Sequence, residues 1–317
     1  ARRVAAQLNM PAAELDLTLT PDPDAPPADA PFSLPDSIPM PVVVNLSDGH
    51  IRQIRFRTDP EAEPLIVDSL RLSLHLDQAR VLIRRLAVDS PLANILAAGH
   101  IGLALPYPME LGVDWHLPLP EVAGEFLPDA DQARGQLVTQ GDLARLTLRH
   151  QVLAPLSLVT EGDVHDPVTD LVLDLTHHWQ ALTVTLAQDQ ILSVAEGRLV
   201  TRGRPDAYVL DLDTAVTLDP WPSLALTLNA EGDTRTLRPA PLSIRSEAGD
   251  LDLSGRIDWH EGLSWVLDLR GRNLEPGRFV ADLPGRLQLA LGSEGRLDDT
   301  LGVVTRVDLR ELSGTLR

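Results

Sequence analysis

The chain has 317 residues, a net charge of −19 and no cysteine, and all of its Lys and Arg positions are arginine. This acidic balance argues against nucleic acid as a partner and against a basic patch that would adsorb to anionic membranes. A chain without cysteine has no disulfide framework, and no stretch of about 18 apolar residues is present that could form a membrane-spanning helix. Hydrophobic residues make up 44% of the chain and aromatic residues only 3%, so leucine, valine and isoleucine dominate its apolar content.

The first predicted strand covers residues 15–19, where leucines alternate with Asp16 and Thr18. Residues 21–31 are rich in proline, which lacks the N–H that a central strand donates to its neighbour. We therefore predict a loop over residues 21–31, and a second strand over residues 41–46.

The same alternation of leucine with polar residues recurs along the rest of the chain. It covers residues 70–76, 171–175, 182–186, 224–228 and 287–291. A period of two places every apolar side chain on one face of a strand and every polar side chain on the other. The sequence therefore predicts an all-β protein with a very large sheet that has one aliphatic face and one hydrated face.

Residues 121–134 interrupt this pattern. Their acidic residues follow no 3.6-residue period, so they are predicted to form an irregular or short helical insertion. Another feature is Gly255, which stands in the apolar row of a predicted strand over residues 251–259. Glycine inside a strand predicts a bend, a bulge or the close approach of another group.

Glycine also recurs at equal intervals in three similar phrases. These are Glu161-Gly162-Asp163, Glu196-Gly197-Arg198 and Glu231-Gly232-Asp233. A fixed period is typical of stacked supersecondary units, and shared turn chemistry in an ordinary β protein would produce the same phrases.

Several turn-rich segments resemble a known family. They are residues 31–35, 39–42, 107–111 with the following Trp115, 253–265, 273–277 and 283–287. Residues 253–265 read Leu-Ser-Gly-Arg-Ile-Asp-Trp-His-Glu-Gly-Leu-Ser-Trp, and residues 283–287 read Leu-Pro-Gly-Arg-Leu. The chain resembles the TamB family, the inner-membrane subunits of the translocation and assembly module, within the AsmA-like group of Gram-negative envelope proteins.

The resemblance covers nearly the whole chain and implies one continuous segment over residues 1–317. It would be a fragment from the earlier part of a longer periplasmic region, with an inner-membrane anchor upstream. The implied fold is an elongated antiparallel sheet curled into a U-shaped groove, the β-taco. The implied function is a bridge that conducts phospholipids between the inner and outer membranes, with a TamA-type outer-membrane barrel as partner. Assembly of outer-membrane proteins through added β-strands is the alternative role.

Under this interpretation, alternation selects the side chains that would contact phospholipid acyl chains. They are Leu171, Leu173, Leu175, Leu182, Val184, Leu186, Leu224, Leu226, Leu228, Leu251, Leu253, Ile257, Trp259, Trp265, Leu267, Leu269, Leu287, Leu289 and Leu291. Two other interpretations remain open. Helices or a second sheet would cover the aliphatic face in a plain sandwich or barrel, and a polysaccharide-active β-helix would expose a carboxylate cluster.

The sequence offers no catalytic motif, cofactor signature or metal-binding pattern. His177 and His178 are adjacent, and on a strand they would point to opposite faces, so they are predicted not to bind one metal ion. Walker, nucleophile-elbow, HExxH and EF-hand patterns are absent from the sequence. We therefore expect a protein that is not an enzyme and uses no cofactor.

Overall fold

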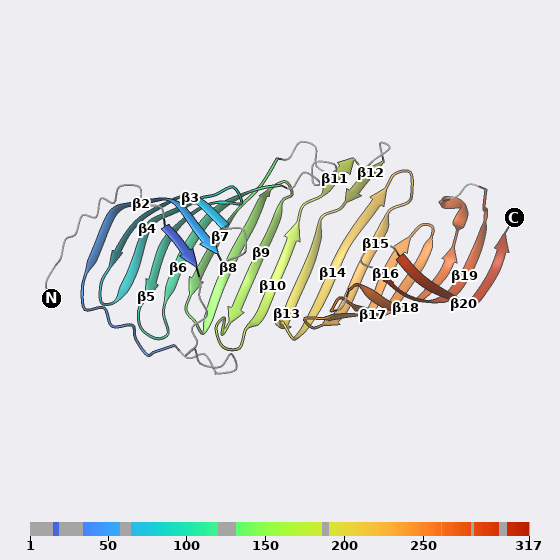
Figure 1. The fold of residues 1–317 in the computed structure, drawn as a ribbon. Coiled ribbons are helices and arrows are strands. Elements are labelled where there is room, and N and C mark those ends of the chain that lie inside the picture. Colours follow the sequence, from blue (N-terminus) through green and yellow to red (C-terminus); the bar gives the residue numbers. More distant parts are fainter. Residues whose placement is uncertain are drawn as a thin grey trace. The chain divides into compact units, whose positions relative to one another are not determined.

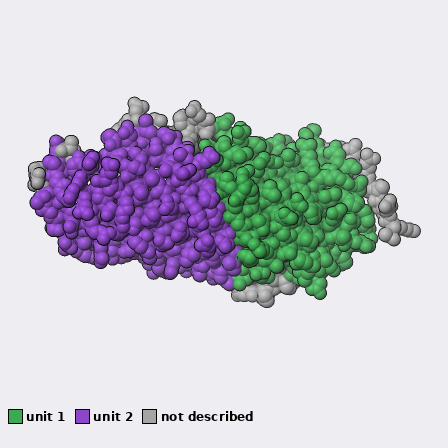
Figure 2. Space-filling model, turned by 180° about the vertical axis from the view of Figure 1, so that it is seen from behind, with its two compact units in different colours: residues 1–124, 128–171 green, residues 125–127, 172–317 purple. Residues whose placement is uncertain are grey.

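The structure is a computed structural model, and it describes residues 15–18, 34–57, 65–119, 131–185, 190–260, 262–279, 282–297 and 303–316. The chain divides into two compact units (Figure 2). Unit 1 comprises Ala1–Gly124 and Pro128–Leu171, and unit 2 comprises Glu125–Leu127 and Val172–Arg317. Strands account for most of the described residues of both units, and a single short 3-10 turn, η2 (Pro276–Arg278), is the helical element among them.

Unit 1 is a meander in which each strand from β2 to β9 pairs antiparallel with the next one (Figure 1). A short first strand, β1, pairs parallel with β2. The strands are β1 (Leu15–Thr18), β2 (Val44–Arg57), β3 (Leu65–Leu76), β4 (Arg80–Asp89), β5 (Asn94–Gly102), β6 (Met109–Pro118), β7 (Gln132–Gly141), β8 (Arg145–Ala154) and β9 (Leu158–His165).

Unit 2 is a second antiparallel meander. Its strands are β10 (Val172–Trp179), β11 (Leu182–Thr185), β12 (Ile191–Val194), β13 (Gly197–Arg204), β14 (Ala207–Leu218), β15 (Leu224–Gly232), β16 (Thr236–Ser246), β17 (Gly249–Asp258), β18 (Ser264–Leu274), β19 (Gly285–Leu297) and β20 (Val303–Leu316). The small β11–β12 hairpin is inserted at one side, because β10 pairs with β13 while β12 and β13 share β14 as their neighbour.

Neither sheet closes on itself. Among the described strands, no pairing joins β2 to β9 or β10 to β20. The predicted all-β, antiparallel fold class is therefore confirmed, and the open sheets are consistent with a curled groove.

Very few of the described side chains are fully enclosed. The buried hydrophobic residues are Leu103, Tyr107, Val200, Ala230 and Ala248, and no large side chain has less than 2% of its surface exposed. A compact β-sandwich buries the inner faces of two sheets against each other in a common core. The described part of this chain contains no such interior, which contradicts the alternative of a closed sandwich.

The first predicted strand, the proline-rich loop and the predicted insertion differ in how far the structure describes them. The first predicted strand is confirmed as β1, while residues 21–31 lie outside the described residues. Most of the predicted insertion at 121–134 is also outside them, and its last three residues are a correction: Gln132–Arg134 begin β7, where their backbone pairs with β6. The single segment over residues 1–317 stays a prediction.

The structure confirms the prediction for Gly255 but not a repeat based on the equally spaced glycines. Gly255 has a φ of +140°, and a Cβ atom placed there would lie 2.2 Å from the carbonyl oxygen of Val266, so the predicted close approach is confirmed. The equally spaced glycines do not occupy equivalent positions. Gly162 lies inside β9, Gly197 begins β13 and Gly232 ends β15, so their equal spacing does not mark one repeated unit.

Candidate functional site

The strand register of unit 2 aligns leucines into a row that runs across the strands. Residues directly opposite each other in neighbouring strands project to the same face of the sheet. Successive pairings from β13 to β20 join Leu199, Leu212, Leu228, Leu242, Leu253, Leu269, Leu291 and Leu309. Each of the first seven is half-buried, and Leu309 on β20 is 55% exposed.

Most of the residues predicted to contact acyl chains lie on the same face as this row. We call it the apolar face of unit 2. The predicted residues on its strands are Leu173, Leu175, Leu182, Val184, Leu224, Leu226, Leu228, Leu251, Leu253, Ile257, Trp265, Leu267, Leu269, Leu287, Leu289 and Leu291. The alternation in the sequence thus assigned a shared face to residues from widely separated segments.

Three predicted residues lie elsewhere. Leu171 precedes β10 and is not part of a strand. Trp259 follows β17, is 42% exposed, and donates its indole N–H to the carbonyl of Thr234 at 3.0 Å. Leu186 lies outside the described residues.

Unit 1 has an apolar face of the same kind, which the predicted site omits. Successive pairings from β2 to β9 join Val44, Leu76, Val81, Ile101, Met109, Gly141, Leu146 and Val164. The alternation in residues 70–76 indicates this face, but the cross-strand partners of those leucines become visible only once the register is known.

Aromatic rings on both apolar faces lie against glycines on the neighbouring strand. The directly opposed pairs are Trp115–Gly135 in unit 1 and Trp179–Gly197, Tyr208–Gly232 and Trp265–Gly295 in unit 2. A Cβ atom placed on any of these glycines would lie 2.3–2.5 Å from its partner's ring. These pairs could not be predicted from the sequence, because nothing in the local sequence shows which glycine faces which ring.

The indole N–H groups of these tryptophans have hydrogen-bond acceptors. Trp265 donates to the hydroxyl of Ser293 at 3.0 Å and Trp179 to the carbonyl of Ala195 at 3.1 Å. Trp115 donates to Nε2 of His150 at 3.1 Å. The polar edge of each ring is therefore satisfied by the sheet itself, which leaves the apolar surface of the ring on the apolar face.

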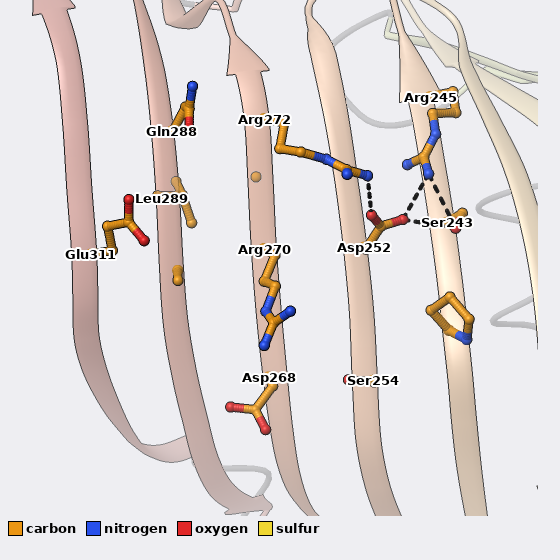
Figure 3. Close-up of a pocket in the computed structure, with 13 residues that line it drawn as sticks. Ser243, Arg245, Asp252, Ser254, Asp268, Arg270, Arg272, Gln288, Leu289 and Glu311 are labelled. Atoms are coloured by element: carbon orange, nitrogen blue, oxygen red, sulfur yellow. Dashed lines mark hydrogen bonds and ion pairs between the residues drawn. The ribbon is translucent and has the colours of Figure 1, made fainter.

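The opposite face of unit 2 is polar and carries arginine–aspartate pairs. Its best-defined cluster surrounds Asp252, which accepts hydrogen bonds from Ser243 at 2.8 Å, Arg245 at 2.9 Å and Arg272 at 2.5 Å (Figure 3). The Ser243 hydroxyl and the two guanidinium groups hold the pKa of Asp252 below its usual value. The carboxylate is thus stabilised in its charged form by its neighbours.

A hollow of about 830 Å³ opens on this polar face across β16–β20 (Figure 3). Arg245, Arg270, Arg272, Asp252, Asp268 and Glu311 are among the residues that line it. Asp268 is paired with Arg310, as Asp252 is with Arg245 and Arg272. Positive and negative side chains therefore balance in the hollow, as is typical of a hydrated sheet face.

The two adjacent histidines project to opposite faces, as predicted. His177 pairs with Leu199 on the apolar face, whereas His178 is exposed and pairs with Arg198. Burial and the neighbouring His178 lower the pKa of His177.

Among the described residues, no group of three or more His, Cys, Asp or Glu side chains could hold a metal ion. Likewise, no helix in the described part of the chain is long and apolar enough to cross a membrane.

Comparison with known proteins identifies a family that this chain matches. The family model described as TamB, N-terminal domain, matches residues 8–317. The translocation and assembly module subunit TamB of Haemophilus influenzae is 26% identical over 238 residues, which are 74% of this chain and 18% of that protein. The chain thus spans about a fifth of the length of this curated relative, and no solved structure matches it significantly. The match over nearly all residues shows that the chain belongs to the family of TamB N-terminal domains.

Proposed function

We propose that this chain is part of a periplasm-spanning bridge that conducts phospholipids between the inner and outer membranes. Acyl chains would lie along the apolar face of each unit, which would act as a hydrophobic groove. The observation that carries this proposal is the leucine row from Leu199 to Leu309, whose first seven members are half-buried on a sheet that forms no closed core in the described part of the chain. A large uncovered apolar surface is typical of a binding surface.

The chemistry of the row suits transport better than tight binding. Burying a methylene group contributes about 0.8 kcal/mol, so an acyl chain of about 16 carbons gains on the order of 13 kcal/mol if it leaves water completely. A single closed pocket with this affinity would retain the lipid. In a row made of successive leucines, the binding free energy of an acyl chain is nearly the same at each position. The acyl chain can therefore move along the row without being trapped at one site.

The whole protein would act within the translocation and assembly module, as the family membership supports. We propose a periplasmic location, an inner-membrane anchor and a TamA-type outer-membrane barrel as the partner. The chain itself would have no catalytic role, and the polar hollow with its paired charges gives no reason to assign one.

A second candidate function is the assembly of outer-membrane proteins by β-strand addition. Membership of the family supports this role, because TamB is a subunit of the translocation and assembly module. Strand addition requires a strand edge whose backbone N–H and C=O groups have no partner.

Photocrosslinking from adjacent positions of β17 tests the lipid proposal. Leu253 lies in the leucine row, whereas the exposed Ser254 points to the polar face of the same strand. A photoreactive amino acid at position 253 should yield phospholipid adducts by mass spectrometry, and the same probe at position 254 should yield none. The two positions are adjacent on one strand and differ in the face of the sheet to which they point.

Two results would contradict the proposal. Equal lipid adducts at positions 253 and 254 would indicate nonspecific association. Protein adducts without phospholipid at position 253 would favour the assembly function instead.

A further inference from the structure

The aromatic–glycine pairs require an explanation beyond backbone conformation. Gly135, Gly197, Gly232 and Gly295 do not have φ values in the left-handed region that favours glycine, unlike Gly255. What excludes a side chain at these positions is mainly space, because the partner ring occupies the volume that a Cβ atom would fill. At Gly135 the nearest atom to that Cβ position is the carbonyl oxygen of Gln151 at 2.3 Å, slightly closer than the Trp115 ring, and at Gly295 the carbonyl oxygen of Val304 lies at 2.8 Å.

The pair of Tyr208 and Gly232 is the clearest case. The three atoms closest to a Cβ atom at Gly232 would all belong to the Tyr208 side chain, at 2.5–2.6 Å. Gly232 is buried beneath this ring. The ring therefore lies directly against the sheet, in the recess that the missing side chain leaves.

The pairs in unit 2 lie beside the leucine row. Tyr208 and Leu212 share one face of β14, as do Trp265 and Leu269 on β18, because each pair differs by an even number of residues along its strand. A ring lying against the sheet adds little height to this face, whereas a ring standing upright would obstruct it. The glycines thus determine how far the largest side chains of this face project.

We propose that the aromatic–glycine pairs are positioning elements that keep the apolar face of the sheet flat, so that acyl chains lie along the leucine row without obstruction by raised aromatic rings. This inference rests on the proposed lipid function and assigns a role to residues that the leucine pattern does not include. Glycine supplies the recess, the ring covers the exposed backbone, and the flat ring surface contacts lipid.

The Gly232→Ala variant tests the proposal, with a photoreactive amino acid at Leu228 as the reporter. Adding a methyl group at Gly232 forces the Tyr208 ring away from the sheet. We expect the yield of phospholipid adducts at position 228 to fall about tenfold, the factor expected if the raised ring displaces about two methylene groups of a bound chain. Gly197→Ala, with the reporter at Leu199, repeats the test at a second pair.

The matched control is Gly292→Ala. Gly292 lies on β19 opposite Asp268 on the polar face, and the three atoms nearest to a Cβ atom there belong to the flexible guanidinium end of Arg310. This variant should leave the adduct yield at position 228 unchanged. Thermal unfolding followed by circular dichroism shows whether each variant remains folded.

A double variant separates positioning from a purely structural role. Tyr208→Leu combined with Gly232→Ala removes the ring that the methyl group would displace, so the adduct yield should return to within about twofold of the parent chain. A folded Gly232→Ala variant with an unchanged yield, or a double variant that stays as low as the single one, would overturn the inference. If the parent chain gives no phospholipid adducts at any reporter position, the proposed function fails and the inference fails with it.

Discussion

At the scale of single residues, the polar faces are stabilised by charged hydrogen bonds in which arginine is the donor. Asp163 on β9 is a clear example, because Arg145 donates to it at 2.7 Å and the Thr147 hydroxyl at 2.8 Å. These two donors lower the pKa of Asp163 to about 2. Such pairs join neighbouring strands across the hydrated face, as Asp163 on β9 does with Arg145 and Thr147 on β8.

The low pKa of Asp163 predicts a pH-dependent contribution to stability. Because the folded protein holds this carboxylate charged, its contribution is fully present above the ordinary pKa near 3.8 and is lost as the pH falls towards about 2. Asp163→Asn should lower the free energy of unfolding at pH 7 by about 1 kcal/mol or less, since Arg145 is largely exposed. The difference from the parent chain should shrink steadily between about pH 4 and pH 2.

Urea unfolding at a series of pH values measures this effect. The control is Asp211→Asn, because Asp211 is exposed on β14 and has no ion-pair partner in the described part of the chain. That substitution should change stability by no more than about 0.5 kcal/mol. A difference for Asp163→Asn that is the same at pH 7 and at pH 2 would contradict the assignment.

At the scale of the elements, glycines with left-handed backbone conformations adjust individual strands. Gly255 interrupts the apolar row of β17, and the β18 backbone approaches it closely at Val266 and Leu267. Gly112 on β6 is different, because its φ is not positive and the nearest atom to an added Cβ would be 4.0 Å away. The two positions therefore predict opposite responses to the same substitution.

Alanine at position 255 should destabilise unit 2 by about 1–3 kcal/mol, since it must adopt a strained φ and collides with the carbonyl oxygen of Val266. Alanine at position 112 should leave unit 1 unchanged or stabilise it by up to about 1 kcal/mol, because it restricts the unfolded chain without a clash. Urea unfolding of both variants provides the comparison. Equal effects at the two positions would show that the close approach at Gly255 is not what requires glycine there.

Also at this scale, local alternation predicted individual strands and faces well. Leu251, Leu253 and Ile257 were assigned to one face from their spacing alone, because side chains alternate strictly along a strand. Leu242 was not identified, since it follows Pro239-Ala240-Pro241, where no alternating pattern is visible. Only its pairing with Leu228 and Leu253 places it in the leucine row.

At the scale of the whole molecule, the proposed lipid groove requires sheets that leave an apolar face uncovered. The low aromatic content and the lack of amphipathic helices favoured this feature, while a second sheet that covers the leucines stayed open as an alternative. The register between strands could not be predicted, since it depends on contacts between residues far apart in the sequence. For the same reason the aromatic–glycine pairs and the polar hollow were not foreseen.

The most direct measurement is an experimental density map of this chain purified in the presence of phospholipid, by crystallography or electron cryomicroscopy. We predict continuous tubular density of acyl-chain width along the row from Leu199 to Leu309, with the aromatic rings flat against their glycines. Leucines of this row packed tightly against another protein layer, with no density for lipid, would contradict it.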